Sequence, residues 1–302
     1  MYKIITPVVT VFDKNEKPDF EANKKVIDFL VEGGVDGILV LGSTGEFTGL
    51  SKKEKYEFLR FYAEYTNQRV ELYAGTGSTN FKETVELSND IYSMGYVAPM
   101  VIGPYYYGLD QEKLFVFYDT LAKSLSGDLY VYNFPARTGH SIAPETMKRL
   151  LEENKNIVGL KDSVTEPNHT NLVCRAAAGH PFLSYSGFDD QFLYNISSGG
   201  NGCIGGLSNI VPEIWSDLVA AANENDFERT IRLENLIHQL MPLYDMDSNF
   251  SLLFKKLMIK RGVDISPQAI FPFNQMDEGI YKKAEKLMDQ VIAQYRDFKG
   301  SN

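Results

Sequence analysis

Short apolar runs alternate along the chain with longer segments in which apolar residues recur at helical spacing. Residues 4–12 form the first apolar run, and residues 20–32 form the first segment with helical spacing. The glycines at 33–34 end that helix, and residues 35–41 are apolar again. Strands that alternate with helices in this way predict a parallel sheet covered by helices.

The same unit then repeats along the chain. The expected strands lie at residues 4–12, 35–41, 70–75, 96–103, 129–133, 157–161, 182–187 and 202–206. The expected helices lie at residues 20–32, 51–65, 80–94, 110–124, 144–154, 165–178, 189–197 and 212–223. Roughly eight strand–helix units in about 220 residues match the size of a closed (β/α)₈ TIM barrel. The strands are apolar throughout, as parallel strands buried on both faces are, and a doubly wound open sheet is the alternative.

Strand signals stop after residue 225. Residues 227–243, 248–262 and 276–298 all have helical spacing, and a proline-punctuated connector occupies residues 266–273. We therefore expect the barrel to span residues 1–224 and a helical C-terminal extension to span residues 225–302. A capping box is predicted at the start of the helix expected over residues 51–65, because Ser51 is followed three residues later by Glu54.

Composition argues against nucleic-acid-binding, membrane-spanning and metal-binding proteins. The net charge of −10 argues against nucleic acid or an anionic membrane as the main partner, although it does not bear on an anionic small substrate. No run of about 18 apolar residues predicts a membrane span, and the first residues lack a signal peptide, so we expect a cytoplasmic protein. Two cysteines and four histidines show no metal-ligand spacing, so no metal is expected.

Polar and aromatic residues gather where the expected strands end. In a (β/α)₈ barrel the active site lies at the carboxyl ends of the strands. Those ends read GSTGE (42–46), GTGSTN (75–80), GPYYY (103–107), YNFPARTG (132–139), KDS (161–163) and SGFDD (186–190). If the strand assignment holds, these groups share one rim.

Lys161 ends a buried strand, which is an unusual place for a cation. Most lysines at such a position extend to water along their aliphatic stem. A lysine that points into a barrel is instead desolvated, and desolvation favours the neutral amine. A neutral amine can attack a ketone and form a Schiff base, whose protonated imine is an electron sink for a carbanion at the adjacent carbon.

Other residues of this rim have both structural and chemical readings. Tyr132 lies on the neighbouring strand. It is either a core side chain or a group that transfers protons beside Lys161. Ser43 and Thr44 either form an ordinary turn or hold a carboxylate. Arg137 is a surface charge or a donor to a second carboxylate. The three tyrosines at 105–107 form a packing cluster or a subunit contact.

These motifs, taken in order, resemble the dihydrodipicolinate synthase / N-acetylneuraminate lyase family of pyruvate-dependent class I aldolases. The motifs that carry the resemblance are GSTGE, PYY, YNFPARTG and GLKDS, and the likeness runs from about residue 4 to residue 292. The resemblance implies that Lys161 forms the Schiff base with pyruvate and that Tyr132 transfers protons. It implies no cofactor beyond that covalent imine, and a homotetramer as the assembly.

The resemblance also assigns the remaining site residues. Ser43 and Thr44 would bind the pyruvate carboxylate or relay protons, and Ile204 would line the pyruvate pocket. Tyr106 would reach a neighbouring subunit's site as a catalytic residue. The other substrate-binding residues expected on this rim are Arg137, Ser163, Gly187 and Asp189.

The expected function is a lyase that makes or cleaves a C–C bond between pyruvate and an aldehyde. GTGSTN, YNFPA, GFDD and the helical tail resemble 2-keto-3-deoxygluconate-type aldolases, so a 2-keto-3-deoxy sugar acid is the preferred substrate. Arg137 instead resembles 4-hydroxy-tetrahydrodipicolinate synthase, where it would meet aspartate semialdehyde. N-acetylneuraminate lyase is a further alternative, although Asp190 and Gly206 depart from its pattern. A non-catalytic keto-acid sensor is the alternative from another class.

Overall fold

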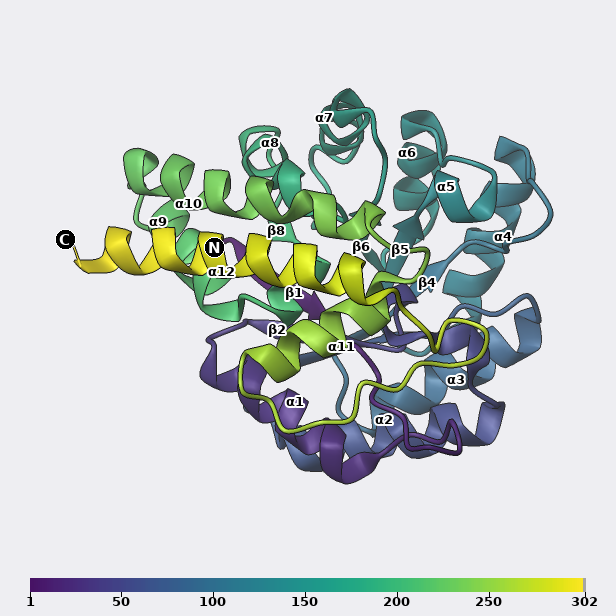
Figure 1. Cartoon of the computed structure of the whole chain (residues 1–302). Coiled ribbons are helices and arrows are strands. Elements are labelled where there is room, and N and C mark those ends of the chain that lie inside the picture. Colours follow the sequence, from purple (N-terminus) through teal and green to yellow (C-terminus); the bar gives the residue numbers. More distant parts are fainter. Residues whose placement is uncertain (301–302) are drawn as a thin grey trace. The chain divides into compact units, whose positions relative to one another are not determined.

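A computed structural model describes residues 1–300 of the chain, and its eight strands close into one barrel in chain order (Figure 1). The strands are β1 (Lys3–Pro7), β2 (Gly37–Val40), β3 (Glu71–Gly75), β4 (Ala98–Ile102), β5 (Leu129–Asn133), β6 (Ile157–Asp162), β7 (Leu183–Ser186) and β8 (Gly202–Cys203). This confirms the (β/α)₈ barrel and excludes the open sheet.

The helices follow the expected ranges closely. They are α1 (Phe20–Glu32), α2 (Lys52–Thr66), α3 (Phe81–Ser93), α4 (Gln111–Ser124), α5 (Pro135–Thr138), α6 (Pro144–Glu153), α7 (Pro167–Ala176), α8 (Phe192–Ser197), α9 (Pro212–Asn223), α10 (Phe227–Leu240), α11 (Phe250–Lys260) and α12 (Glu278–Gly300). The short α5 was not expected. The helix expected over residues 227–243 ends at Leu240 and continues as the 3₁₀ turn η5 (Met241–Asp245), where Pro242 lacks the N–H that an α-helix needs.

The chain divides into two compact units. The first unit contains residues 71–204, and the second contains residues 2–70 together with the chain from Gly205 onward. The boundary at residue 225 between a barrel and a helical extension stays a prediction.

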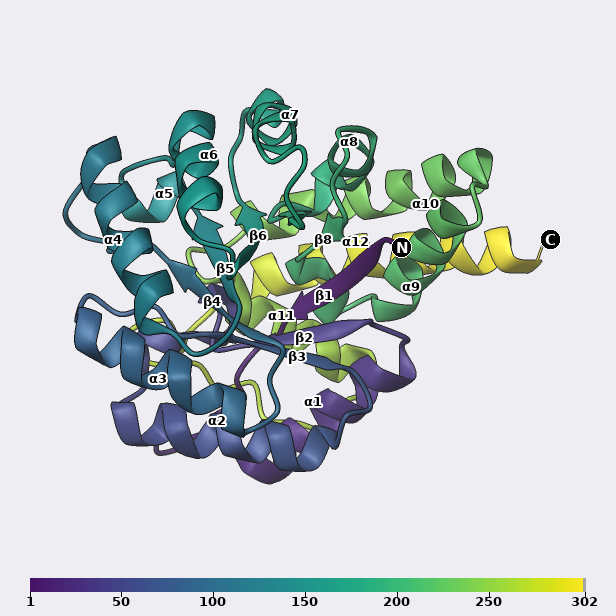
Figure 2. The same cartoon turned by 180° about the vertical axis from the view of Figure 1, so that it is seen from behind.

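The core of the first unit lies between its strands and its helices. Val101, Val131 and Leu160 belong to one buried apolar cluster with Tyr118 of α4 and Leu150 of α6. Figure 2 shows α4, α6 and α7 on the outer side of β4, β5 and β6. Since side chains alternate along a strand, the residues next to Val131 and Leu160, including Tyr132 and Lys161, face the opposite side of the sheet from these helices.

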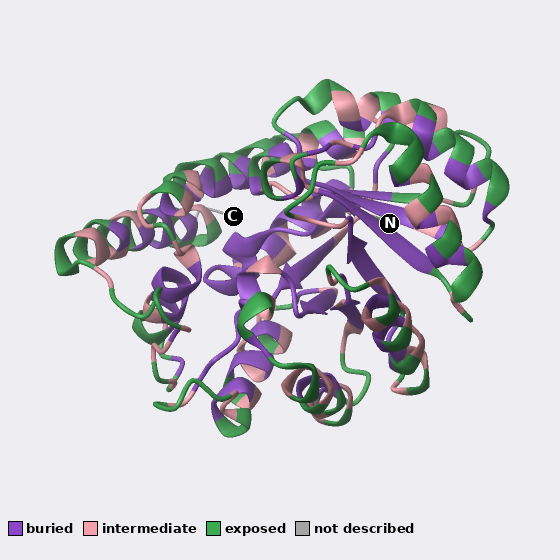
Figure 3. Cartoon of the chain, turned by 90° about the vertical axis from the view of Figure 1, so that its right-hand side faces the viewer, coloured by how far each residue is buried: buried purple, intermediate pink, exposed green. Residues whose placement is uncertain are grey.

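In the second unit, aromatic rings join the first two helices. Phe20 of α1 lies 5.0 Å from Phe61 of α2, measured between ring centroids. The capping box is confirmed, because Ser51 Oγ accepts from the Glu54 N–H and Glu54 Oε2 accepts from the Ser51 N–H. Most helices combine buried and exposed positions, whereas α11 is buried at five consecutive residues, 251–255 (Figure 3). Within residues 1–300, no helix is both long and apolar enough to cross a membrane.

Candidate active site

Lys161 and Tyr132 meet at the carboxyl ends of β6 and β5. The two residues are direct partners in the parallel ladder. Lys161 Nζ lies 4.5 Å from the centre of the Tyr132 ring, and the residues are only 5% and 7% exposed. The structure thus brings together the two residues that the sequence singled out first, and it buries the amine rather than extending it to water.

The ring of Tyr130 lies one layer beneath this pair. Tyr130 and Gly159 lie two residues before Tyr132 and Lys161, on the same faces of their strands. A Cβ at Gly159 would lie 2.2 Å from Cε1 of Tyr130, so the ring occupies the space that the missing side chain leaves. Burial raises the pKa of Tyr130 to about 12. The Tyr130 ring thus fills the space one layer from Lys161, toward the amino ends of the strands.

Ser163 and Gly187 border the same space. The Ser163 N–H donates to the Asn133 carbonyl over 2.9 Å, and the Gly187 N–H donates to the Asp162 carbonyl over 2.7 Å. A Cβ at Gly187 would lie 1.9 Å from Ser163 Oγ and 3.2 Å from Cε of Lys161. Glycine at this position is therefore what leaves room beside the lysine.

We expect Gly187→Ala to lower kcat/KM by about 100-fold, because displacing a reacting group by about 1 Å costs a factor of this size. The added methyl group must push Ser163 or the Lys161 stem aside, while the backbone of Gly187 has no positive φ that would itself demand glycine. Steady-state kinetics would measure the change. Gly300→Ala is the control for stability, since its Cβ meets no atom within 4 Å and its backbone has no positive φ. Wild-type kinetics in Gly187→Ala would contradict this account of the pocket.

Two phenylalanines that the sequence did not single out extend the site. Phe134 lies 5.7 Å from Tyr132 and 6.2 Å from Phe188, measured between ring centroids. Together the three rings form an apolar wall between the ends of β5 and β7. Phe134 lies inside the YNFPARTG motif, but nothing in the motif itself indicates that its ring would stack on Tyr132.

The remaining expected site residues of the first unit differ in burial: two are buried and two are exposed. Asp189 is buried in the 3₁₀ turn η3 (Asp189–Gln191), and Ile204 is buried just after β8, with its N–H donating to the Ser186 carbonyl. Arg137 is exposed on α5, with its guanidinium carbon 6.0 Å from the Phe134 ring centre. Tyr106 is 85% exposed and packs edge-on against Tyr107.

Ser43 and Thr44 lie in the second unit, on the 3₁₀ turn η1 (Ser43–Gly45). Ser251 of α11 donates its hydroxyl to the Thr44 carbonyl over 2.8 Å, and Thr10 donates to the Gly45 carbonyl over the same distance. The GSTGE turn is thus held by buried hydroxyls from two distant parts of the chain.

A buried ion pair lies next to that turn. Lys255 Nζ donates to Glu46 Oε1 over 2.6 Å and to the carbonyls of Thr10 and Gln268. Both side chains are almost wholly buried. Burial lowers the pKa of Lys255, while the charge and hydrogen bond of Glu46 oppose that shift. Lys255 had no sequence signal, because its partner lies about 200 residues away.

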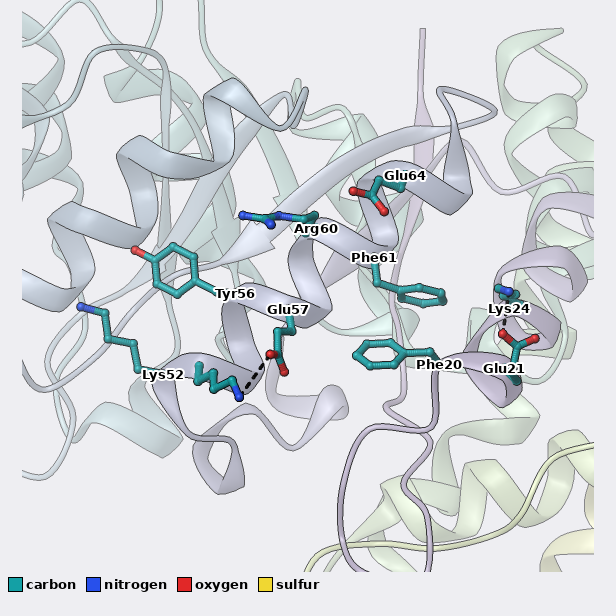
Figure 4. Close-up of a pocket in the computed structure, with 10 residues that line it drawn as sticks. Phe20, Glu21, Lys24, Lys52, Tyr56, Glu57, Arg60, Phe61 and Glu64 are labelled. Carbon is teal, nitrogen blue, oxygen red and sulfur yellow. Dashed lines mark hydrogen bonds and ion pairs between the residues drawn. The ribbon is translucent and has the colours of Figure 1, made fainter.

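A groove of about 860 Å³ runs between α1 and α2 and contains none of the expected site residues (Figure 4). Its charges are largely paired, with Lys24 Nζ 2.7 Å from Glu21 and Lys53 Nζ 3.6 Å from Glu57. Within residues 1–300, no group of three or more histidine, cysteine, aspartate or glutamate side chains is arranged to hold a metal ion.

The chain is similar to proteins of one family along almost its whole length. A model described as the dihydrodipicolinate synthetase family matches residues 1–291. The chain is 31% identical to "Putative 2-dehydro-3-deoxy-D-gluconate aldolase YagE" of Escherichia coli K12, covering 95% of this chain and 96% of that protein. It is 34% identical to 4-hydroxy-tetrahydrodipicolinate synthase of Kosmotoga olearia, covering 80% and 82%. The crystal structure of YagE in complex with pyruvate matches with a TM-score of 0.93, at 30% identity, covering 96% and 98% of the two chains.

Proposed function

Because the chain belongs to the dihydrodipicolinate synthetase family, we propose that it is a class I aldolase that forms a Schiff base between pyruvate and Lys161. Family membership and the aldolase relative make it a lyase. The observation that carries the proposal is the buried Lys161 amine, 4.5 Å from the Tyr132 ring and open beside Gly187. Within the first unit, no hydrogen bond or ion pair of the Lys161 amine explains its burial.

The reaction in the cleavage direction begins at the keto carbon of a 2-keto acid. The Lys161 amine adds to that carbon, and the resulting hydroxyl takes a proton from the Tyr132 phenol and leaves as water, which gives a protonated imine. The Tyr132 phenolate then takes the proton of the hydroxyl on C4, the C3–C4 bond breaks, and its electron pair enters the imine to give an enamine. The aldehyde leaves, Tyr132 returns this proton to C3, and hydrolysis of the imine releases pyruvate and the free lysine and restores the Tyr132 phenol. Synthesis follows the same steps in reverse.

A 2-keto-3-deoxy sugar acid is the substrate that we propose. The similarity to YagE, whose name gives it this substrate class, covers more of both chains than the similarity to the Kosmotoga synthase. The synthase remains the second candidate, because that relative has the higher identity. Turnover of 2-keto-3-deoxygluconate compared with aspartate semialdehyde separates the two, and Arg137→Ala should impair only the second reaction strongly.

Pyruvate followed by borohydride tests the imine directly. We expect reduction to add one stable pyruvate-derived group to Lys161, detected by peptide mass mapping. Lys255 is a control within the same molecule, because it is equally buried but occupied by Glu46, and it should stay unmodified. An unmodified Lys161 would refute the mechanism. If pyruvate labels Lys161 but the protein turns over no aldehyde, the result would instead favour a non-catalytic keto-acid sensor.

Several expectations stay predictions. The exposed pair of Tyr106 and Tyr107 supports a contact with a second copy of the chain, as a homotetramer would provide, and Tyr106 has a positive φ of 86° that only a fixed environment would retain. The roles of Ser43 and Thr44 toward pyruvate, and the cytoplasmic location, also remain to be tested.

A further inference from the structure

Behind Lys161 and Tyr132, on the helix side of the sheet, lies a second polar cluster. Asn133 and Asp162 follow the two site residues in the chain and are themselves partners in the ladder. Their side chains therefore point away from the site, toward α7. Asn133 is 2% exposed and Asp162 is fully buried, so neither side chain is placed to meet a substrate.

These two residues belong to a closed ring of hydrogen bonds. Asn133 Nδ2 donates to Asp162 Oδ1 over 2.9 Å, and Asp162 Oδ2 lies 2.8 Å from Nδ1 of His169 on α7. His169 Nε2 lies 2.8 Å from the Ile142 carbonyl, and the Ile142 N–H donates to Asn133 Oδ1 over 3.0 Å. The ring thus returns to its starting residue and joins β5, β6, α7 and the segment before α6.

The partners of His169 determine its protonation. A carboxylate and a carbonyl both accept hydrogen bonds, so both ring nitrogens of His169 must donate, which requires the imidazolium form. Burial lowers the pKa of His169, but the hydrogen bond and the charge of Asp162 outweigh that effect and raise the pKa overall. The other titratable groups nearby are Glu166, which also favours the charged form, and Cys174 of α7, which interacts with Asp162.

We propose that Asn133, Asp162 and His169 are positioning residues, which hold the ends of β5 and β6 so that Tyr132 and Lys161 keep their catalytic separation. This inference rests on the proposed function of Lys161 and Tyr132. The physical basis of the proposal is that the ring fixes Asn133 and Asp162, which directly follow Tyr132 and Lys161 in the chain. The carbonyls of Asn133 and Asp162 also accept backbone hydrogen bonds from Ser163 and Gly187, which border the pocket. The ring therefore supports these two pocket residues as well.

The first test uses His169→Ala and measures the strand ends without reference to activity. Amide hydrogen exchange at Ser163 and Gly187 should become at least about 10-fold faster, because their acceptors belong to residues that the ring holds. The matched control is His180→Ala, which removes a half-buried histidine from the turn after α7. Unchanged exchange at both amides in His169→Ala would overturn the proposal.

The second test measures catalysis. His169→Ala should lower kcat for aldol cleavage by about 10–100-fold, while borohydride still traps pyruvate on Lys161 to completion. Asp162→Asn should retain most activity, since an asparagine can meet Asn133 and a neutral His169 with the same geometry. Wild-type kcat in His169→Ala would overturn the proposal. Failure of the wild type to trap pyruvate would refute the proposed function instead, and the exchange test would still stand.

The pH profile separates positioning from a merely structural role. A histidine with a raised pKa contributes fully below its ordinary value of about 6.5, and its contribution is lost as pH rises through the folded-state pKa. The kcat of the wild type should therefore fall as pH rises through the folded-state pKa of His169. The kcat of Asp162→Asn should not show this fall, because the hydrogen-bonded ring of that variant contains a neutral His169. Identical profiles for the two proteins would contradict the proposal.

Discussion

Lys161→Arg is expected to lower kcat/KM for C–C bond cleavage on the order of 10⁴-fold or more, because arginine retains the positive charge but stays protonated and cannot form an imine. The side chain is buried beside Tyr132 and Gly187, so no other amine of the first unit is placed to replace it. Steady-state assay with a 2-keto-3-deoxy sugar acid measures the loss. Trapping with pyruvate and borohydride should disappear in the same variant.

Lys155→Arg is the matched control for that experiment. Lys155 lies two residues before β6 and is exposed, so the same exchange there should leave the rate unchanged. Thermal unfolding of both variants should show that they fold. Residual cleavage within about 10-fold of the wild type in Lys161→Arg would mean that the reaction does not pass through an imine on this residue.

Lys255→Met is expected to cause the largest loss of stability, about 3–5 kcal/mol in the free energy of unfolding, because it leaves the Glu46 carboxylate buried without its cation. The carbonyls of Thr10 and Gln268 also lose their donor. For a chain of this size the melting temperature should fall by roughly 5–15 °C. Differential scanning calorimetry and urea unfolding would measure the two quantities.

Two further variants show whether the loss comes from the unpaired charge. Combining Lys255→Met with Glu46→Gln removes the lone carboxylate, so the double variant should regain a substantial part of the stability. Lys260→Met removes a lysine that pairs with Glu285 on the surface, and it should cost less than about 1 kcal/mol. Equal losses for Lys255→Met and Lys260→Met would mean that burial of the pair contributes nothing measurable.

The sequence predicted most of the fold because local periodicity reports burial. An apolar run flanked by helical spacing has one stable arrangement here, a strand covered by helices, and its repetition predicted the barrel. The same pattern placed Lys161 and Tyr132 at the ends of neighbouring strands. Their juxtaposition needed only the chain order of a parallel barrel, so it was predictable without coordinates.

By itself, then, the sequence determined the barrel, the capping box at Ser51 and the pairing of Tyr132 with Lys161, since each depends on residues close in the chain or on strand order. Only the tertiary structure decided which other side chains support them. The Phe134 and Phe188 wall, the Lys255–Glu46 pair and the ring through His169 each include a contact between residues about 30 to 200 positions apart. Such contacts leave no periodic trace in sequence, because they depend on the three-dimensional packing of separate elements.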